Sequence, residues 1–267
     1  MKNRKLLSQI TLLFSLIIPS LGFSQSFENP DFKALNDNKW KVRDVSFVVG
    51  VDLDIYDKIS MDYIKEYAIT DKFFDIDLSN ASEEVYQEVV GGMLSFNLTF
   101  SQPYKNRKVS QEFRVGMEAT LGREAMVEFY DNANEDYLRY TYCTMQNVYS
   151  LNASYQFRFS TYNSKFSLYT GIGGKIGTTS NNQILLIASE GNTQYAAGDY
   201  YTKAKNAQFY KAYIPIGFDF ALSKRIMFNT EFRYGFGYEK VNSGKDYFIN
   251  ESCVFQFGLR YNLFRYY

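Results

Sequence analysis

The most informative absence in this sequence of 267 residues is histidine, which does not occur at all. Ser-His-Asp and Cys-His catalysis, imidazole zinc sites and proton transfer through histidine are therefore excluded. The two cysteines, Cys143 and Cys253, lie far apart and form no CxxC motif, which argues against a structural zinc or thioredoxin-like site. Whether they pair with each other stays open. We expect no metal and no cofactor.

An excess of charge of one sign is also missing, because Lys+Arg and Asp+Glu both number 29, so nothing points to a nucleic-acid partner. Proline is scarce at 4 residues and glycine moderate at 17, which argues against disorder. Aromatic residues, in contrast, are abundant, with 24 Tyr and 24 Phe. Tyrosine joins an apolar ring to a polar hydroxyl, so this excess is typical of partly hydrated surfaces and membrane interfaces.

Long apolar runs are absent except near the N-terminus. A basic start at residues 2–5 precedes an apolar run over 12–18 and small residues at 22–24, which is typical of an export signal with cleavage after Ser24. The alternative is a membrane-anchoring helix, for which the run is short. No stretch of about 20 apolar residues follows, so a mature chain that enters a membrane must cross it as strands.

Period-two alternation of apolar and polar residues dominates the rest of the chain and predicts strands. Eight segments show it: 46–55, 90–102, 113–121, 149–159, 166–176, 211–220, 226–236 and 255–263. The connections between them alternate in length. The long ones are 57–89, 122–147, 178–208 and 239–251, and the short ones are 103–110, 161–165 and 223–225.

Eight strands with alternating long and short connections predict an all-β fold, an eight-stranded antiparallel up-and-down transmembrane β-barrel with both ends on the short-turn side. The expected organisation is a signal peptide over 1–24, a periplasmic N-terminal segment over 25–45 and an outer-membrane barrel over 46–267. A soluble barrel with an apolar interior is the alternative. The apolar faces of all eight segments lack charged residues, which favours lipid, since a charge facing lipid costs about 2–4 kcal/mol at the midplane.

The polar faces carry six acidic and six basic residues, a balance expected of charges that pair inside a narrow lumen. We predict a structural ion-pair network of Asp52, Arg114, Glu118, Arg158, Lys175, Asp219, Glu231, Arg233 and Arg260. The remaining charges on these faces are Asp54, Glu112 and Lys211. Solvated surface charges that balance by chance are the alternative.

The chain ends in an alternating segment, 259–267, that closes on an aromatic residue, with Arg265 where an apolar residue is usual. With the signal and the eight segments, this resembles the small outer-membrane barrel proteins of OmpA-, OmpX- and OmpW-like architecture. The resemblance covers residues 46–267. It implies an outer-membrane location in a Gram-negative-type cell, with membrane lipid, lipopolysaccharide and the barrel-insertion machinery as partners. Barrel enzymes of this class generally rely on histidine, so we expect no enzyme.

Two short motifs have ordinary explanations. Asp75 and Asp77 resemble the opening of a calcium loop, but Asn80 stands where glycine is needed and Tyr86 where glutamate is needed, so an acidic loop is favoured. The glycines of 171–174 lie within a strand pattern and no helix follows, so close packing in the lumen is favoured over phosphate binding.

The connection over 57–88 carries nine acidic and three basic residues. An acidic, tyrosine-rich crown of long loops predicts a structural or surface-interaction barrel that meets an extracellular partner, although a merely solvated surface is equally compatible. The alternatives are a narrow channel for small or apolar solutes, that is, a porin-like role, and an accessory barrel of an envelope or secretion complex.

The export signal and the barrel together make a first prediction. The mature protein begins at Gln25, fractionates with the outer membrane and changes its gel mobility on heating, because a closed barrel resists detergent until it is boiled. N-terminal sequencing, membrane fractionation and gels of heated and unheated samples check this. Recovery from the soluble periplasm without a heat shift would contradict the membrane assignment.

Overall fold

The computed structural model describes residues 40–70, 74, 78, 81–101, 109–131, 138–160, 165–190, 193–195, 201–223, 225–242 and 244–263. Four features expected from the sequence lie outside this part of the chain: the signal peptide over 1–24, most of the segment over 25–45, the aspartates of the calcium-like motif, and Arg265.

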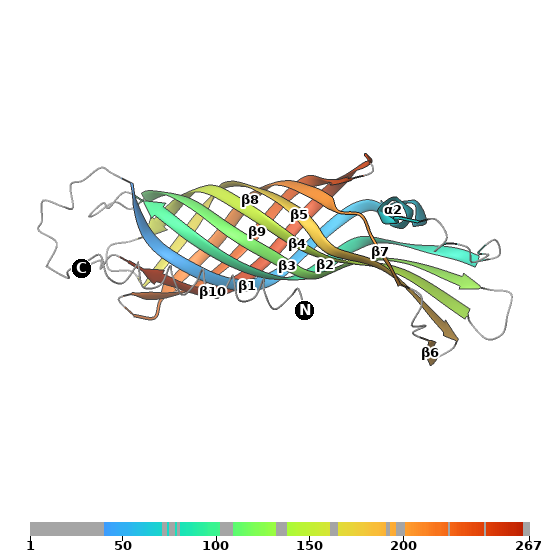
Figure 1. Ribbon diagram of the computed structural model, residues 1–267. Coiled ribbons are helices and arrows are strands. Elements are labelled where there is room, and N and C mark those ends of the chain that lie inside the picture. The colour runs from blue at the N-terminus through green and yellow to red at the C-terminus, as the bar shows by residue number, and fades with distance from the viewer. Residues whose placement is uncertain are drawn as a thin grey trace, which may run out of the picture. The chain divides into compact units, whose positions relative to one another are not determined.

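Eight long strands form one antiparallel sheet that closes on itself (Figure 1). They are β1 (Lys41–Ile59), β2 (Ala81–Ser101), β3 (Val109–Asp131), β4 (Leu138–Ser160), β5 (Phe166–Glu190), β8 (Ala207–Ala221), β9 (Ile226–Val241) and β10 (Asp246–Asn262). Each pairs with the next along the chain, and β10 pairs back onto β1, with Phe47 opposite Leu259. The predicted eight-stranded up-and-down barrel is confirmed.

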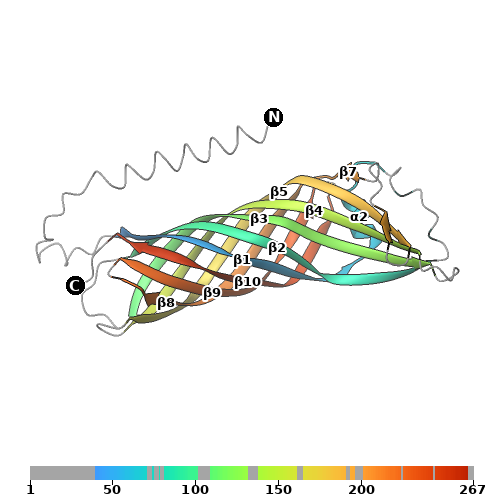
Figure 2. The same cartoon turned by 90° about the horizontal axis from the view of Figure 1, so that it is seen from below.

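Two further strands, β6 (Thr193–Tyr195) and β7 (Tyr201–Lys203), are short and pair only with β5. A seven-residue helix, α2 (Met61–Tyr67), follows β1. The strands run obliquely across the barrel (Figure 2). We call the end that carries α2 the mouth end and the end with the short connections the turn end. In the described part of the chain, no helix has the length and apolar character needed to cross a membrane.

The strands are longer than the alternation indicated, at 15 to 25 residues each. Most of the predicted long connection 122–147 is strand, and that prediction was wrong. The reason is a bulge at Gly122, whose φ of 61° is costly for other residues and whose insertion shifts the register between Thr120 and Arg123. Asn181, with φ 58°, stands at a similar irregularity in β5. Beyond each bulge the inward positions change parity, which breaks the period-two pattern.

The two faces of the barrel are inverted relative to a soluble protein. Large apolar side chains point outward, with Ile172 exposed to 69%, whereas Arg260 points inward and is 0% exposed. A continuous exposed apolar surface of this kind is stable against lipid and not against water.

Two rings of aromatic side chains bound the apolar belt. The ring at the turn end includes Phe100, Phe113, Tyr155, Phe166, Phe220 and Phe228. The ring at the mouth end includes Tyr149, Tyr210, Tyr234, Phe236, Tyr238 and Phe248. Along β9, Phe228 and Tyr238 stand ten residues apart. Tilted strands need about 9–11 residues to cross a bilayer, so the rings mark its two interfaces.

The facing of the strands yields the second prediction. Leu259 is exposed on the apolar belt, and Leu259→Arg should lower the stability of the inserted barrel by about 2–4 kcal/mol because it places a charge in lipid. Unfolding by urea in lipid vesicles measures this. Leu259→Ile is the matched control and should change little. A barrel as stable with arginine as with isoleucine would mean that this face does not meet lipid.

Candidate functional site: the sealed lumen

Sixteen charged side chains from seven of the eight barrel strands, all but β2, fill the interior among the described residues, and we call them the lumen network. The acids are Asp44, Asp52, Asp54, Glu112, Glu118, Asp219, Glu231 and Glu239, and the bases are Arg43, Arg114, Arg123, Arg158, Lys175, Lys211, Arg233 and Arg260. Eight negative and eight positive groups cancel, which a narrow, poorly hydrated lumen requires.

At the turn end the network is built around one arginine. Arg158 donates its Nε hydrogen to Glu112 Oε1 at 2.5 Å and a further hydrogen to Asp219. Arg260 lies 3.3 Å from the same Asp219 carboxylate. Carboxylates shared between guanidinium groups tie strands β3, β4, β8 and β10 together across the barrel.

Tyr169 joins this level to the next. Its ring lies among three guanidinium carbons, those of Arg114 at 5.0 Å, Arg158 at 5.2 Å and Arg260 at 5.3 Å. Its hydroxyl donates to Glu231 at 2.6 Å, and Arg114 pairs with the same carboxylate. One aromatic ring therefore separates and stabilises three like charges, since the ring face attracts cations.

Glycine makes room for this arrangement. A Cβ on Gly217, which is opposite Tyr169, would lie 2.3 Å from the Tyr169 ring. A Cβ on Gly173 would lie 2.5 Å from the ring of Tyr213 in the same way. Each tyrosine thus lies over a glycine of the neighbouring strand, which is the close packing expected for the glycines of 171–174.

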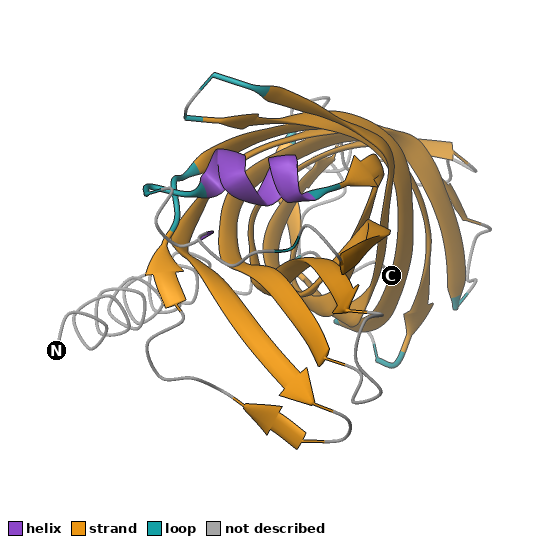
Figure 3. Cartoon of the chain, turned by 90° about the vertical axis from the view of Figure 1, so that its right-hand side faces the viewer, coloured by secondary structure: helices purple, strands orange, loops and turns teal. Residues whose placement is uncertain are grey.

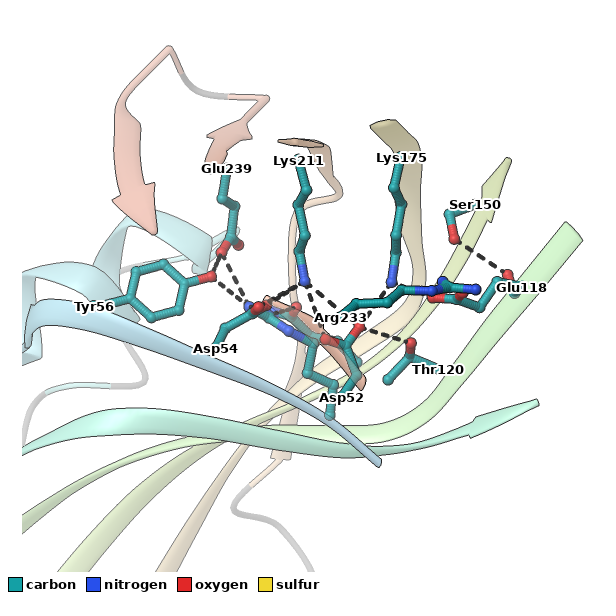
Figure 4. Close-up of polar contacts among 12 residues, drawn as sticks. Asp52, Asp54, Tyr56, Glu118, Thr120, Ser150, Lys175, Lys211, Arg233 and Glu239 are labelled. Carbon is teal, nitrogen blue, oxygen red and sulfur yellow. Dashed lines mark hydrogen bonds and ion pairs between the residues drawn. The ribbon is translucent and has the colours of Figure 1, made fainter. Parts of the chain in front are cut away.

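In the middle of the lumen, acids and bases form a chain (Figure 4). Glu118 pairs with Arg233 at 2.8 Å and with Lys175, and Lys175 also lies 2.8 Å from Asp52. Asp52 in turn contacts Lys211 at 3.2 Å. Each of these charges has at least one partner of opposite sign, so none remains free to bind a passing ion.

At the top of the network, a carboxylate links it to the helix. Arg123 lies 3.2 Å from Asp54 and 3.5 Å from Glu239. Glu239 accepts a hydrogen bond from Tyr56 (Figure 4). It also accepts one from Tyr63 of α2 at 3.2 Å. Burial and the neighbouring Glu239 carboxylate raise the pKa of the Tyr63 hydroxyl well above its usual range, so that it stays protonated and donates.

Above the charges lies an apolar layer that we call the mouth core. It is formed by inward side chains of the strands and by α2: Tyr56, Ile59, Tyr63, Ile64, Tyr67, Ala68, Val89, Ala125, Val127, Phe129, Tyr142, Val148, Ile184, Leu186, Ala204, Ala207, Phe209, Val241 and Ile249. Seen from this end, α2 lies at the mouth of the barrel (Figure 3). Fully burying one large apolar side chain contributes about 1.5–3 kcal/mol, and α2 buries several.

The segment before β8 holds the helix in place. Ala68 forms a β-bridge with Ala204, and the backbone N–H of Lys205 donates to the carbonyl of Tyr67 at 2.8 Å. The Lys205 ammonium also donates to the carbonyl of Glu66 at 3.1 Å. These contacts occupy carbonyls at the C-terminus of a short helix that would otherwise lack partners.

All nine residues assigned to the network from the sequence are buried in the lumen. Within the network, Glu118 contacts Arg233 and Lys175, and Arg114 contacts Glu231. Sequence reasoning missed Arg43, Asp44, Arg123 and Glu239. Asp44 and Glu239 continue the alternation of their strands, so the period-two pattern could have predicted them. Arg43 and Arg123 follow or adjoin register shifts, which alternation cannot locate.

The long connection over 57–89 also differs from expectation. Tyr63 and Tyr67, expected on a tyrosine-rich crown, are buried in the mouth core. Cys143 and Cys253 are free thiols. The described residues include no group of three or more His, Cys, Asp or Glu side chains arranged to hold a metal ion.

A closed ring of eight antiparallel strands, an apolar belt between two aromatic rings and an interior of paired charges define a small outer-membrane β-barrel. No protein-family model and no curated protein matches the chain.

Solved structures to which the chain is similar include three small outer-membrane barrels. Neisserial surface protein A is 15% identical, with a TM-score of 0.32 and coverage of 81% of this chain and 97% of that one. The attachment invasion locus protein Ail of Yersinia pestis is 13% identical, with a TM-score of 0.30 and coverage of 83% and 99%. The outer membrane protein OprG of Pseudomonas aeruginosa is 15% identical, with a TM-score of 0.37 and coverage of 85% and 98%.

The position of Tyr169 yields the third prediction. Tyr169→Leu removes the ring that separates three guanidinium groups and should lower the free energy of unfolding by about 2–5 kcal/mol. Tyr169→Phe keeps the ring and removes two hydrogen bonds, the one that the hydroxyl donates to Glu231 and the one that it accepts from Asn229 at 2.9 Å. The bond to the charged group is worth about 1.5–3 kcal/mol. Urea unfolding in vesicles should therefore rank wild type above Phe and Phe above Leu. Equal stability of the Phe and Leu variants would contradict a role for the ring.

Proposed function

We propose that this outer-membrane barrel is non-enzymatic and does not conduct, and that it presents a rigid surface outside the membrane for structural or interaction roles. The observation that carries the proposal is the double closure of the lumen, by paired charges in the bilayer region and by the mouth core above them. An open pore needs neither.

The charge layer resists ions for a simple reason. A permeating ion must separate pairs such as Lys175 with Asp52, and breaking a buried pair costs about 3–5 kcal/mol because it leaves an uncompensated charge. Several such pairs follow one another along the lumen. The mouth core resists water and ions independently, since it offers them few hydrogen-bonding groups.

The orientation follows from the same layout. Both described ends of the barrel, Lys41 and Asn262, lie at the turn end, which we assign to the periplasm as in an exported barrel that the insertion machinery closes from that side. The mouth end then lies outside the cell among membrane lipopolysaccharide. The absence of histidine from the sequence supports a non-enzymatic role.

The alternative is a narrow channel for small or apolar solutes. A small cavity lined by Lys175, Lys211, Tyr213, Arg233, Ser252 and Val254 within the network favours it. Transport through this cavity requires α2 and the mouth core to move aside. An accessory role in an envelope complex would place a partner on the outer surfaces and leaves the lumen closed.

Conductance in a planar bilayer tests the proposal and is the fourth prediction. The wild type should show negligible conductance. Replacing Arg114, Arg158 and Arg260 by Ala removes three positive charges and much volume, but the mouth core still closes the barrel. Combining this triple change with a Gly/Ser linker in place of 61–67 opens both layers. A small cation-selective conductance should then appear, because the remaining lumen charge is negative.

The matched controls for the combined variant are the two variants that each open only one layer. The triple variant and the linker variant should both stay close to the closed wild type. Steady conductance of the wild type, with a selectivity that the triple change leaves untouched, would overturn the closed lumen in favour of the channel.

A further inference from the structure

A small cavity lies among the charges in the middle of the lumen. Its volume is about 10 Å³, close to the space that one water-sized particle occupies. Three of the side chains that line it are cations, and no carboxylate of the described chain is among the lining groups. The lining comes from four neighbouring strands: Lys175 of β5, Lys211 and Tyr213 of β8, Arg233 of β9, and Ser252 and Val254 of β10.

The cavity lies beside an inward glycine of β9. Gly235 pairs with Tyr213 on one side and with Ser252 on the other. Because glycine has no side chain, Gly235 adds nothing to the space between its two partners. A Cβ at this position would overlap the carbonyl oxygen of Ala212, so a larger residue does not fit there. The gap is therefore set by the packing of the backbones of β8 and β9.

One hydroxyl of the cavity lining lacks a partner. Among the described residues, the hydroxyl of Tyr213 has no hydrogen-bond partner. Tyr213 is 8% exposed, so bulk water does not replace the missing partner. Buried polar groups are nearly always satisfied, and an unsatisfied one commonly marks a bound water molecule or ion. A particle in the cavity that accepts the hydrogen of this hydroxyl would satisfy it.

The lysines of the lining also keep hydrogens for such a particle. Each ammonium group has three hydrogens. Lys175 donates to Asp52 at 2.8 Å and to Glu118. Lys211 donates to Asp52 at 3.2 Å and to Asp54 at 2.6 Å (Figure 4). Two carboxylate partners account for two hydrogens of each lysine, so the ion pairs neutralise the charges without using every donor.

This lining favours an acceptor over a water molecule. Lysine and arginine side chains can only donate hydrogen bonds, and the two hydroxyls can donate as well. A halide ion accepts from all of these groups at once. A water molecule must also donate two hydrogens, and the only acceptors in the lining side chains are the hydroxyl oxygens of Tyr213 and Ser252. The three cations attract a negative particle in addition.

We propose that the cavity binds one halide ion, such as chloride, as a fixed part of the closed lumen. The small volume excludes polyatomic anions such as phosphate or acetate. The carboxylates that pair with Lys175, Lys211 and Arg233 disfavour more than one negative charge. The lining comes together only when the four strands are paired, so the ion binds the folded barrel and not the unfolded chain.

The inference goes beyond the proposed function and does not rest on it. A bound ion accounts for the cavity without a passage to either end of the barrel. A conducting wild type would refute the closed lumen and leave the halide site intact. A cavity that holds only water would refute the halide site and leave the closed lumen intact.

Stability in different salts is the fifth prediction. An ion that binds only the folded barrel raises the urea midpoint of unfolding as its concentration rises. The wild type, refolded into vesicles, should unfold at a higher urea concentration in sodium chloride or bromide than in sodium gluconate of equal ionic strength, because gluconate is too large for the cavity. Tyr213→Phe should weaken the halide affinity obtained in this way about tenfold or more, the change expected from losing one hydrogen bond to a charged group.

Tyr67→Phe is the matched control. The hydroxyl of Tyr67 is also buried and lacks a hydrogen-bond partner among the described residues, but Tyr67 belongs to α2 and packs in the mouth core. Its replacement should leave the halide dependence unchanged. The heat-dependent gel shift confirms that each variant is folded. An equal loss of halide dependence in both variants would mean a general effect of salt and would overturn the proposal.

A crystal structure of the wild type with bromide locates the ion, because bromide scatters X-rays anomalously. The anomalous peak should lie in the cavity beside Tyr213 and Lys211, and it should weaken or vanish in Tyr213→Phe. Equal urea midpoints of the wild type in chloride and gluconate, or bromide peaks only outside the lumen, would show that the cavity holds water and would overturn the proposal. A peak in the cavity without any halide effect on stability would mean binding at crystal concentration only and would overturn it as well.

Discussion

The constraint on which this structure depends is the pairing of charges in a narrow, buried space. Eight carboxylates and eight cations share the interior of an eight-stranded ring. An isolated charge there is prohibitively costly, so each group needs a partner of opposite sign. Because the partners sit on different strands, pairing fixes register and closure together. Lys175 on β5 reaches Asp52 on β1, and Arg114 on β3 reaches Glu231 on β9. Such pairs add little net stability but penalise every misaligned closure of the ring.

The bulges explain how one barrel contains two different interiors. Below Gly122, even-numbered residues of β3 point inward and are polar, such as Arg114 and Glu118. Above it, odd-numbered residues point inward and, after Arg123, are apolar, such as Val127. The same shift turns Glu128 toward the outer face, where neighbouring side chains cover it. On β3, one glycine insertion thus marks the change from charged to apolar inward residues and sets which residues face outward beyond it.

How far the sequence predicts the structure follows from the same physics. Period-two alternation predicts the barrel, the facing of its strands and most of the network. Lipid on one side of each strand and a narrow lumen on the other allow few departures from this alternation. Asp44 and Glu239 fit the period-two pattern and were missed because the predicted segments were too short: 46–55 begins after Asp44, and 226–236 ends before Glu239. The sequence could not predict that Arg123 points into the lumen. No neighbouring residue indicates that Gly122 forms a bulge with positive φ rather than lying in a loop. The helix at the mouth was hidden for another reason: its stability comes from burying Tyr63, Ile64 and Tyr67 against distant strands, and seven residues alone carry little helical signal.

The closed interior supports the parts of strands β2 to β5 that lie beyond the membrane. A sheet that extends well beyond the membrane needs packing on one face, and the mouth core with α2 supplies it to β2, β3, β4 and β5. The opposite face carries polar groups that bond one another, with Arg139 of β4 paired to Glu128 of β3 and Tyr130 donating to the same carboxylate. A passage through the barrel would remove the mouth core, and with it the packing that supports strands β2 to β5 beyond the mouth-end aromatic ring.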